Sequence, residues 1–186
     1  CLEKIRLPFS NLTYLCRMDE IKNKVKDSGL IQLDLADYKP RVSIIGIDLA
    51  AQLWQGLVLK EKDFRTWIKE NDWTVYEQKA VFIYCSADAI VPTWAYMLVA
   101  SALQNTAKKV VVGTQLDLEK SLISEAINAI DLSAFQDGKV IVKGCSDIAA
   151  PEFAMVTLLT HLQGVVQSIM YGEPCSTVPI FKRKNA

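Results

Sequence analysis

The sequence is poor in several features on which common active sites depend. It holds a single histidine, and no segment has the Cys-x-x-Cys spacing of a zinc ribbon or either standard glycine-rich phosphate loop. Its 21 basic and 21 acidic residues balance, so the charge gives no signature of a nucleic-acid partner or an anionic membrane surface. No apolar run is long enough to span a bilayer. We therefore expect neither a nucleic-acid-binding protein nor a membrane protein.

The chain of 186 residues, 51% of them hydrophobic, suits one domain with a sizeable core. Residues 1–17 begin with Cys1, show no helical or strand period and lack the features of a signal peptide. Met18 is a natural start, so we interpret 1–17 as a non-native or disordered extension and 18–186 as a single α/β domain. Because the sequence shows no signal peptide, we expect a cytoplasmic protein. In that compartment, clustered cysteines indicate metal binding or catalysis more often than disulfides.

Local periodicity outlines the first elements of this domain. Alternating apolar and polar residues at 30–35 and a β-branched run at 42–47 predict two strands. Large apolar residues spaced at i, i+3 and i+4 predict an amphipathic helix over 60–71. At the other end of the chain, we interpret the residues from Val178 onward as a tail.

A strand–loop–helix–strand pattern occurs twice, at about 79–113 and 139–172. In both copies an apolar strand runs into Cys-Ser, and an Asp, a Pro, an apolar helix ending in Leu-Gln and a final strand closing in Gly follow. Deleting Ala87 aligns the copies and matches Cys85 with Cys145. Such units give parallel strands, and continuous apolar strands are typical of sheets covered on both faces. We therefore predict a three-layer α/β domain with a largely parallel sheet, built on a duplicated β-Cys-loop-α-β unit.

The predicted topology places the repeat cysteines at one edge of the sheet. Each ends the first strand of its copy, and the carboxyl edge is where open α/β sheets bind ligands. If the copies are related by pseudo-symmetry, their first strands lie side by side, about 4.8 Å apart, and Cys85 meets Cys145 within several Å. Cys175 follows the last strand at the same edge. We expect these three cysteines to form one site.

Polar residues accompany all three cysteines. Asp88 and Asp147 are candidate extra metal ligands, or groups that orient the thiolates, although either aspartate also suits the cap of its helix. The serines that directly follow the cysteines, Ser86, Ser146 and Ser176, are candidate ligand-binding groups. The pattern therefore predicts a polar, thiol-rich site.

Two kinds of thiol chemistry suit this arrangement. The first hypothesis is a metal or iron–sulfur site, because three thiolates can hold zinc or three corners of a cubane cluster. The second is thiol redox or sulfur transfer, with Cys85 and Cys145 as the pair and Cys175 as the resolving thiol. Both hypotheses leave open whether the protein is an enzyme.

Two further hypotheses receive less support from the residues. A hydrolase or acyltransferase with a cysteine nucleophile needs a base, and the only histidine, His161, lies near the far end of the second predicted helix. A non-enzymatic interaction protein with buried, inert cysteines is the remaining alternative, because free cysteine is among the most buried residue types.

Four long segments carry a resemblance to a known family: 55–65, 85–96, 143–147 and 171–179. Through them, residues 18–184 resemble the bacterial family catalogued as domain of unknown function 2480. The resemblance implies no assigned activity and no catalytic residue. It does imply, through neighbouring genes, a link to iron–sulfur-cluster assembly. On that basis the expected cofactor is an iron–sulfur cluster or zinc, and the expected partners are iron–sulfur assembly proteins.

Overall fold

The computed structural model describes residues 29–144 and 148–184, and its strands form two main sheets. The first sheet is fully parallel and has the order β2-β5-β6. Helix α2 precedes β5, helix α3 connects β5 with β6, and a short hairpin, β3–β4, is inserted after β2. The bounds of these elements are Ile44–Asp48 (β2), Leu53–Trp54 (β3), Val58–Leu59 (β4), Glu61–Glu70 (α2), Ala80–Tyr84 (β5), Thr93–Leu103 (α3) and Lys109–Val112 (β6).

The second sheet has the order β1-β7-β8-β9. Its first three strands are parallel, and β9 pairs antiparallel with β8 through a two-residue turn. Helix α5 connects β7 with β8, and helix α4 leads from the first sheet into the second. The bounds are Leu30–Asp34 (β1), Gln115–Asn128 (α4), Lys139–Lys143 (β7), Pro151–Leu162 (α5), Ser168–Glu173 (β8) and Ser176–Lys182 (β9). Within the described ranges, the helices are all too short or too polar to cross a membrane.

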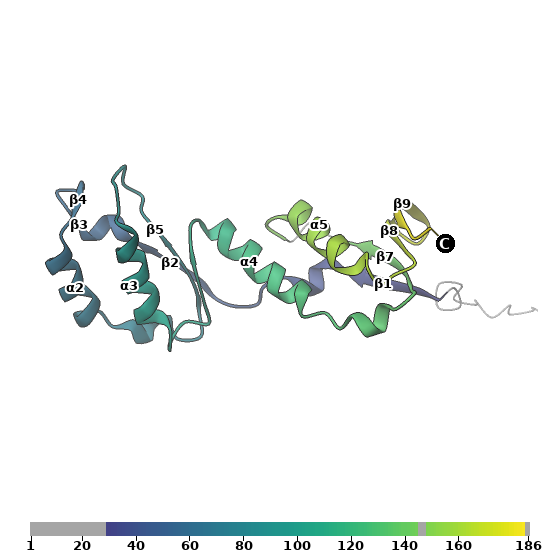
Figure 1. Cartoon of the computed structure of the whole chain (residues 1–186), viewed down its shortest axis with the longest axis horizontal. Helices are drawn as coiled ribbons and strands as arrows, with labels where there is room; N and C mark the ends of the chain where they lie inside the picture. Colours follow the sequence, from purple (N-terminus) through teal and green to yellow (C-terminus); the bar gives the residue numbers. More distant parts are fainter. Residues whose placement is uncertain (1–28, 145–147, 185–186) are drawn as a thin grey trace, which may run out of the picture.

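Each sheet has its own buried cluster. In the first, Phe64 of α2 and Val99 of α3 pack on strands β2 and β5. In the second, Ile123 of α4 and Leu158 of α5 pack on β1, β7 and β8. Figure 1 shows the consequence for shape: the two sheets lie at opposite ends of an elongated molecule, with α4 between them.

Four short 3₁₀ helices recur at equivalent places in the two halves. Each of the two N-terminal strands ends in an aspartate whose side chain caps the 3₁₀ helix that follows it. Two further 3₁₀ helices precede β5 and β7, again with an aspartate as the cap. Asx caps of this kind satisfy a backbone N–H locally, which explains why the pattern is encoded in short stretches of sequence. The bounds of these four 3₁₀ helices, all within the described residues, are Leu35–Tyr38, Leu49–Gln52, Trp73–Tyr76 and Leu132–Phe135.

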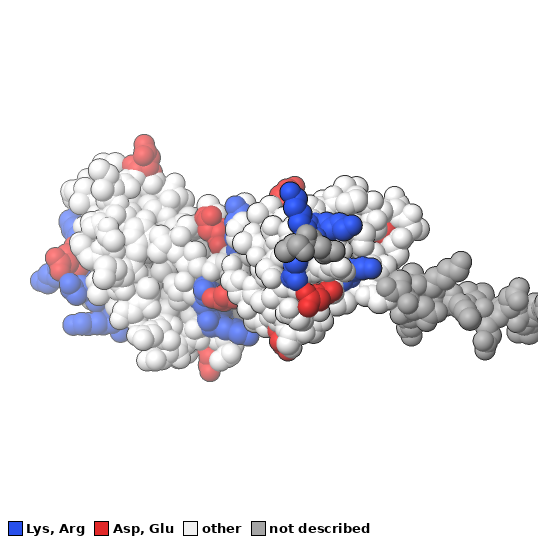
Figure 2. Space-filling model, turned by 45° about the vertical axis from the view of Figure 1, so that its right-hand side comes forward, with Lys and Arg blue, Asp and Glu red and all other residues white. Residues whose placement is uncertain are grey.

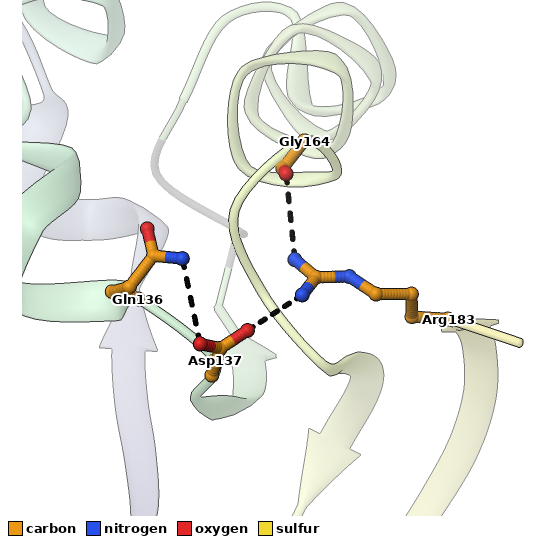
Figure 3. A network of polar contacts seen from close by, with 4 residues as sticks. All are labelled: Gln136, Asp137, Gly164 and Arg183. Atoms are coloured by element: carbon orange, nitrogen blue, oxygen red, sulfur yellow. Dashed lines mark hydrogen bonds and ion pairs between the residues drawn. The ribbon is translucent and has the colours of Figure 1, made fainter. Parts of the chain in front are cut away.

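A polar network fastens the last strand to the second half. Arg183, one residue beyond β9, donates from Nη1 to Oδ1 of Asp137 (2.5 Å) and from Nη2 to the carbonyl of Gly164 (3.4 Å). The side-chain amide of Gln136 reaches the other carboxylate oxygen of Asp137 at 3.5 Å. Figure 3 shows these groups converging from the turn before β7, the turn after α5 and the end of β9.

The charged residues on the face drawn in Figure 2 are of both signs. On the face drawn in Figure 2, the Lys and Arg side chains lie interspersed with Asp and Glu across both halves. Several of them form pairs, as in the contacts of Lys109 with Glu125 and of Arg65 with Glu61. This distribution agrees with the balanced composition.

The predicted α/β fold with mostly parallel strands is confirmed, although its strands are divided between two sheets. The strands expected at 30–35 and 42–47 correspond to β1 and β2, and the helix expected at 60–71 corresponds to α2. The interpretation of the C-terminal residues as a tail is wrong, because they form β9. Pro179 lies within that strand and argued against a strand in the sequence, because proline is tolerated only in an edge strand.

The expectation that the first strands of the two copies lie side by side is also wrong. Strand β5 pairs with β2 and β6, whereas β7 pairs with β1 and β8. Each repeat strand takes one of the N-terminal strands as its neighbour, so the copies build separate sheets. The duplicated β-Cys-loop-α-β unit itself stays a prediction, because the second Cys-Ser-Asp segment, 145–147, lies outside the described residues.

Candidate functional site

The carboxyl edge of the first sheet is tied together by an aspartate that sequence reasoning missed. Asp48 ends β2, and Ser86 follows the neighbouring strand β5. Oδ1 of Asp48 accepts hydrogen bonds from the backbone N–H of Ala50 (2.9 Å) and of Ser86 (3.0 Å), and Oδ2 accepts from the Ser86 hydroxyl (2.5 Å). The hydroxyl is the main reason that the pKa of Asp48 lies below its ordinary value, with the two backbone donors adding to it.

Cys85 is held beside this Asp48–Ser86 contact. Its thiol is free and half-buried, packs against the first core and donates to the carbonyl of Ala87 at 3.6 Å. Burial, and to a lesser degree the neighbouring Cys85, raises the pKa of Tyr96 above its ordinary value, so the phenol and the thiol lie within electrostatic reach. Asp88, a predicted support for a metal, has an exposed side chain. The first sheet thus presents one thiol at its carboxyl edge.

The carboxyl edge of the second sheet carries a different set of groups. Cys175 lies in the turn between β8 and β9, where its free thiol is exposed, and Ser176 begins β9. Asp34, at the end of β1, caps the following 3₁₀ helix and lies 3.8 Å from the ammonium of Lys143. Gly144 has a φ of +100°, and a Cβ at this position would lie 2.5 Å from Oδ1 of Asp34, so only glycine suits this close approach.

Three of the predicted site residues, Cys145, Ser146 and Asp147, lie outside the described residues. Of the two remaining cysteines of the predicted site, Cys85 follows a strand of the first sheet and Cys175 a strand of the second. Figure 1 places β5 and the β8–β9 hairpin in opposite halves of the molecule. Within 29–144 and 148–184, no three His, Cys, Asp or Glu side chains are grouped as metal ligands. The two described thiols are therefore not brought together within one chain.

The strand registers also change which residues correspond between the halves. In the first sheet, Asp48 at the end of β2 lies opposite Tyr84, and in the second, Asp34 at the end of β1 lies opposite Lys143. Tyr84 and Lys143 are 59 residues apart. The same spacing relates Ser86 to Cys145, whereas the sequence alignment matched Cys85 with Cys145. Counted along the sequence, this spacing pairs the Asp48-bound serine with a cysteine that lies outside the described residues.

A cavity of about 650 Å³ adjoins the carboxyl edge of the second sheet. It lies between α5 and strands β8 and β9, and its walls include Val142, Pro151, Met155, Met170 and Ile180. Sequence reasoning did not find it, because its walls come from segments far apart in the chain. The lone histidine, His161, instead has Nε2 at 3.5 Å from the carbonyl of Ile130, a packing contact between α5 and the segment after α4.

The fold and these sites together define an α/β protein that presents cysteines at the carboxyl edges of two mainly parallel sheets. Residues 19–183 match the family described as "Protein of unknown function (DUF2480)", and the chain belongs to that family. The resemblance identified from the sequence is therefore confirmed. No curated protein and no solved structure matches this chain.

Proposed function

We propose that this chain is a thiol redox or sulfur-transfer protein whose exchanging pair is Cys145 and Cys175. The pairing of β7 with β8 carries the proposal: the two are neighbouring parallel strands, with Val142 opposite Tyr171. Cys145 comes two residues after the end of β7 and Cys175 two residues after the end of β8. Because neighbouring strands are about 4.8 Å apart, the segments that follow them start at the same edge.

The pair has the requirements of dithiol chemistry. The exposed thiol of Cys175, as its thiolate, attacks a disulfide sulfur of a small-molecule or protein oxidant and displaces one thiolate as the leaving group. Attack by Cys145 on the resulting mixed disulfide forms the intramolecular disulfide and releases the second thiolate. The pair loses two electrons and two protons, and the oxidant is reduced to two thiols. In sulfur transfer, an acceptor thiolate attacks the outer sulfur of a persulfide on either cysteine, and the cysteine leaves as a thiolate while the acceptor becomes the persulfide.

This proposal changes the pair expected from the sequence. Cys85 and Cys145 were expected to exchange, but they follow strands of different sheets, which makes Cys175 the more suitable partner of Cys145. Cys85 becomes a separate thiol. The proposal includes a cytoplasmic location, because glutathione and thioredoxin return a dithiol to its reduced form there.

Disulfide mapping after mild oxidation tests the proposal. The full chain and its Cys85→Ser, Cys145→Ser and Cys175→Ser variants are equilibrated in glutathione buffers of increasing potential and mapped by peptide mass spectrometry. We expect a Cys145–Cys175 disulfide in the unsubstituted chain and in Cys85→Ser, and its loss in the other two variants. A disulfide that includes Cys85, or no intramolecular disulfide at any potential, contradicts the proposed pair.

A second candidate function is metal or iron–sulfur binding at the same edge. The observation that favours it is the carboxylate of Asp34, which faces Gly144 one residue before Cys145 and adds an oxygen ligand to two thiolates. A further thiolate from a second chain, or from an iron–sulfur assembly protein, completes a zinc or cluster site. Metal and sulfide are measured on protein purified without oxygen. Loss of metal in Cys145→Ser and Cys175→Ser but not in Cys85→Ser supports this edge, and loss in all three supports the three-cysteine site.

A further inference from the structure

We propose that the cavity beside α5 is a binding site for an apolar small molecule that carries an amino group. The inference is independent of the thiol chemistry proposed above, although the cavity lies at the same edge of the second sheet. Its volume, about 650 Å³, lies in the range of roughly 300–1,000 Å³ that is typical of small-molecule sites.

The cavity exists because the sheet extends beyond its helical cover. Helix α5 connects and covers β7 and β8, whereas β9 adds a fourth strand at the edge of the sheet. Ile180 of β9 and Val156 of α5 line the cavity and remain 51% and 63% exposed, although both are large aliphatic side chains. A ligand that covers these exposed aliphatic groups removes them from water, which favours binding.

Two methionines give this cavity adaptable walls. Met155 extends from α5 and Met170 from β8, so they line the space from the helix and from the sheet. The unbranched thioether side chain has three rotatable bonds and adjusts to ligands of different outline. The walls therefore favour an apolar body, such as an aromatic ring or a short aliphatic chain, without demanding one shape.

The charge around the cavity selects the polar end of the ligand. Among the described residues that line it, Glu152 is the one charged side chain, at the second position of α5 beside Pro151. Its carboxylate attracts an ammonium group and repels a carboxylate or phosphate. A glutamate in the first turn of a helix also stabilises the helix through its dipole, so the test must separate ligand selection from this structural role.

Three probes with one ring system and different head groups make that separation. Binding of 2-naphthylmethylamine, 2-naphthalenemethanol and 2-naphthoate to the full chain is measured by isothermal titration calorimetry. We expect the amine to bind about fivefold more tightly than the alcohol, as suits a partly exposed ion pair, and the carboxylate to bind most weakly. Equal affinities for the three probes, or no binding of any of them, overturn the proposal.

Variants locate the site and isolate the charge. Glu152→Gln should remove the preference for the amine while leaving the affinity for the alcohol unchanged. Val156→Trp, a substitution of an exposed wall residue, should fill the cavity and weaken all three probes by at least tenfold without unfolding the chain. Glu70→Gln, an exposed glutamate of α2 in the other half, is the matched control and should change nothing. A preference that survives in Glu152→Gln, or binding that survives in Val156→Trp, contradicts the assignment.

Discussion

Ser86 donates both its backbone N–H and its hydroxyl to the carboxylate of Asp48, at 3.0 and 2.5 Å. The contact joins the ends of two neighbouring strands, directly beside Cys85. In the second sheet, Asp34 occupies the corresponding place at the end of β1 and likewise caps its 3₁₀ helix. The two aspartates therefore form a matched pair: both are caps, and only Asp48 has the described hydrogen bonds to a serine.

Removing the Asp48 carboxylate should loosen the segment around Cys85. We expect Asp34→Ala to cost about 1 kcal/mol as a lost cap, and Asp48→Ala to cost about 1 kcal/mol more because the Ser86 bonds are lost as well. Labelling of Cys85 by a thiol reagent, measured against labelling of Cys175 in the same chain, should become severalfold faster in Asp48→Ala. If Asp34→Ala accelerates Cys85 labelling equally, the Asp48–Ser86 contact does not position the thiol.

The lowered pKa of Asp48 predicts part of the response to acid. A carboxylate whose pKa is lower in the folded chain stabilises the fold above its ordinary pKa. That contribution is lost as the pH falls through the lowered value. We expect Asp48→Asn to have a lower urea midpoint than the unsubstituted chain at pH 6 and a smaller loss on acidification. Parallel midpoint curves for the two proteins between pH 6 and 3 would contradict this assignment.

Gly46 is expected to resist substitution. A Cβ at this position would lie 2.5 Å from Cζ of Phe82 and 3.0 Å from the ring of Tyr84, two rings that stack at 5.3 Å. Gly46→Ala should therefore displace the stack and cost about 1–3 kcal/mol, measured by chemical denaturation with near-UV circular dichroism. Gly164→Ala is the control, because a Cβ there meets nothing within 4 Å. Equal stability of the two variants would show that the rings of Phe82 and Tyr84 move aside without a cost in stability.

The prediction of a single domain can be tested from the two separate cores. Leu158→Ala removes a side chain that is buried in the second core, and it should cost about 2–5 kcal/mol. All four tryptophans lie in the first half, at positions 54, 67, 73 and 94. If the chain unfolds as one unit, tryptophan fluorescence and far-UV circular dichroism should shift together to lower denaturant. A fluorescence transition that stays in place while circular dichroism shifts would show two independent units.

Val99→Ala provides the converse experiment in the first core, where Val99 is fully buried. Its fluorescence transition should shift whether the halves are coupled or not. The comparison with Leu158→Ala therefore measures the coupling through α4, which contacts β5 and β6 of the first sheet and α5 of the second half.

The elements of this fold were largely predictable from the sequence because their signals are local. The apolar run of β5 and the i, i+3, i+4 spacing in α2 reflect burial of one strand and of one helix face. The repeated Asp-Leu-Ala segments at 34–36 and 48–50 are a local signal that could have indicated Asp48 as the cap of a short helix. The family match rested on contiguous segments in the same way.

The choice of sheet neighbours was decided only by the tertiary structure. An apolar strand presents the same backbone N–H and C=O groups to any neighbour, so its sequence shows that it is buried but not what it pairs with. Pairing with β1 and β2 placed the two repeat strands in different sheets, which separated Cys85 from Cys175. The addition of β9 beyond the cover of α5 created the cavity. The sequence by itself thus determined most of the strands and helices, with β9 as an exception, and that thiols follow the strands. The tertiary structure decided which thiols share an edge, because that depends on contacts between distant segments.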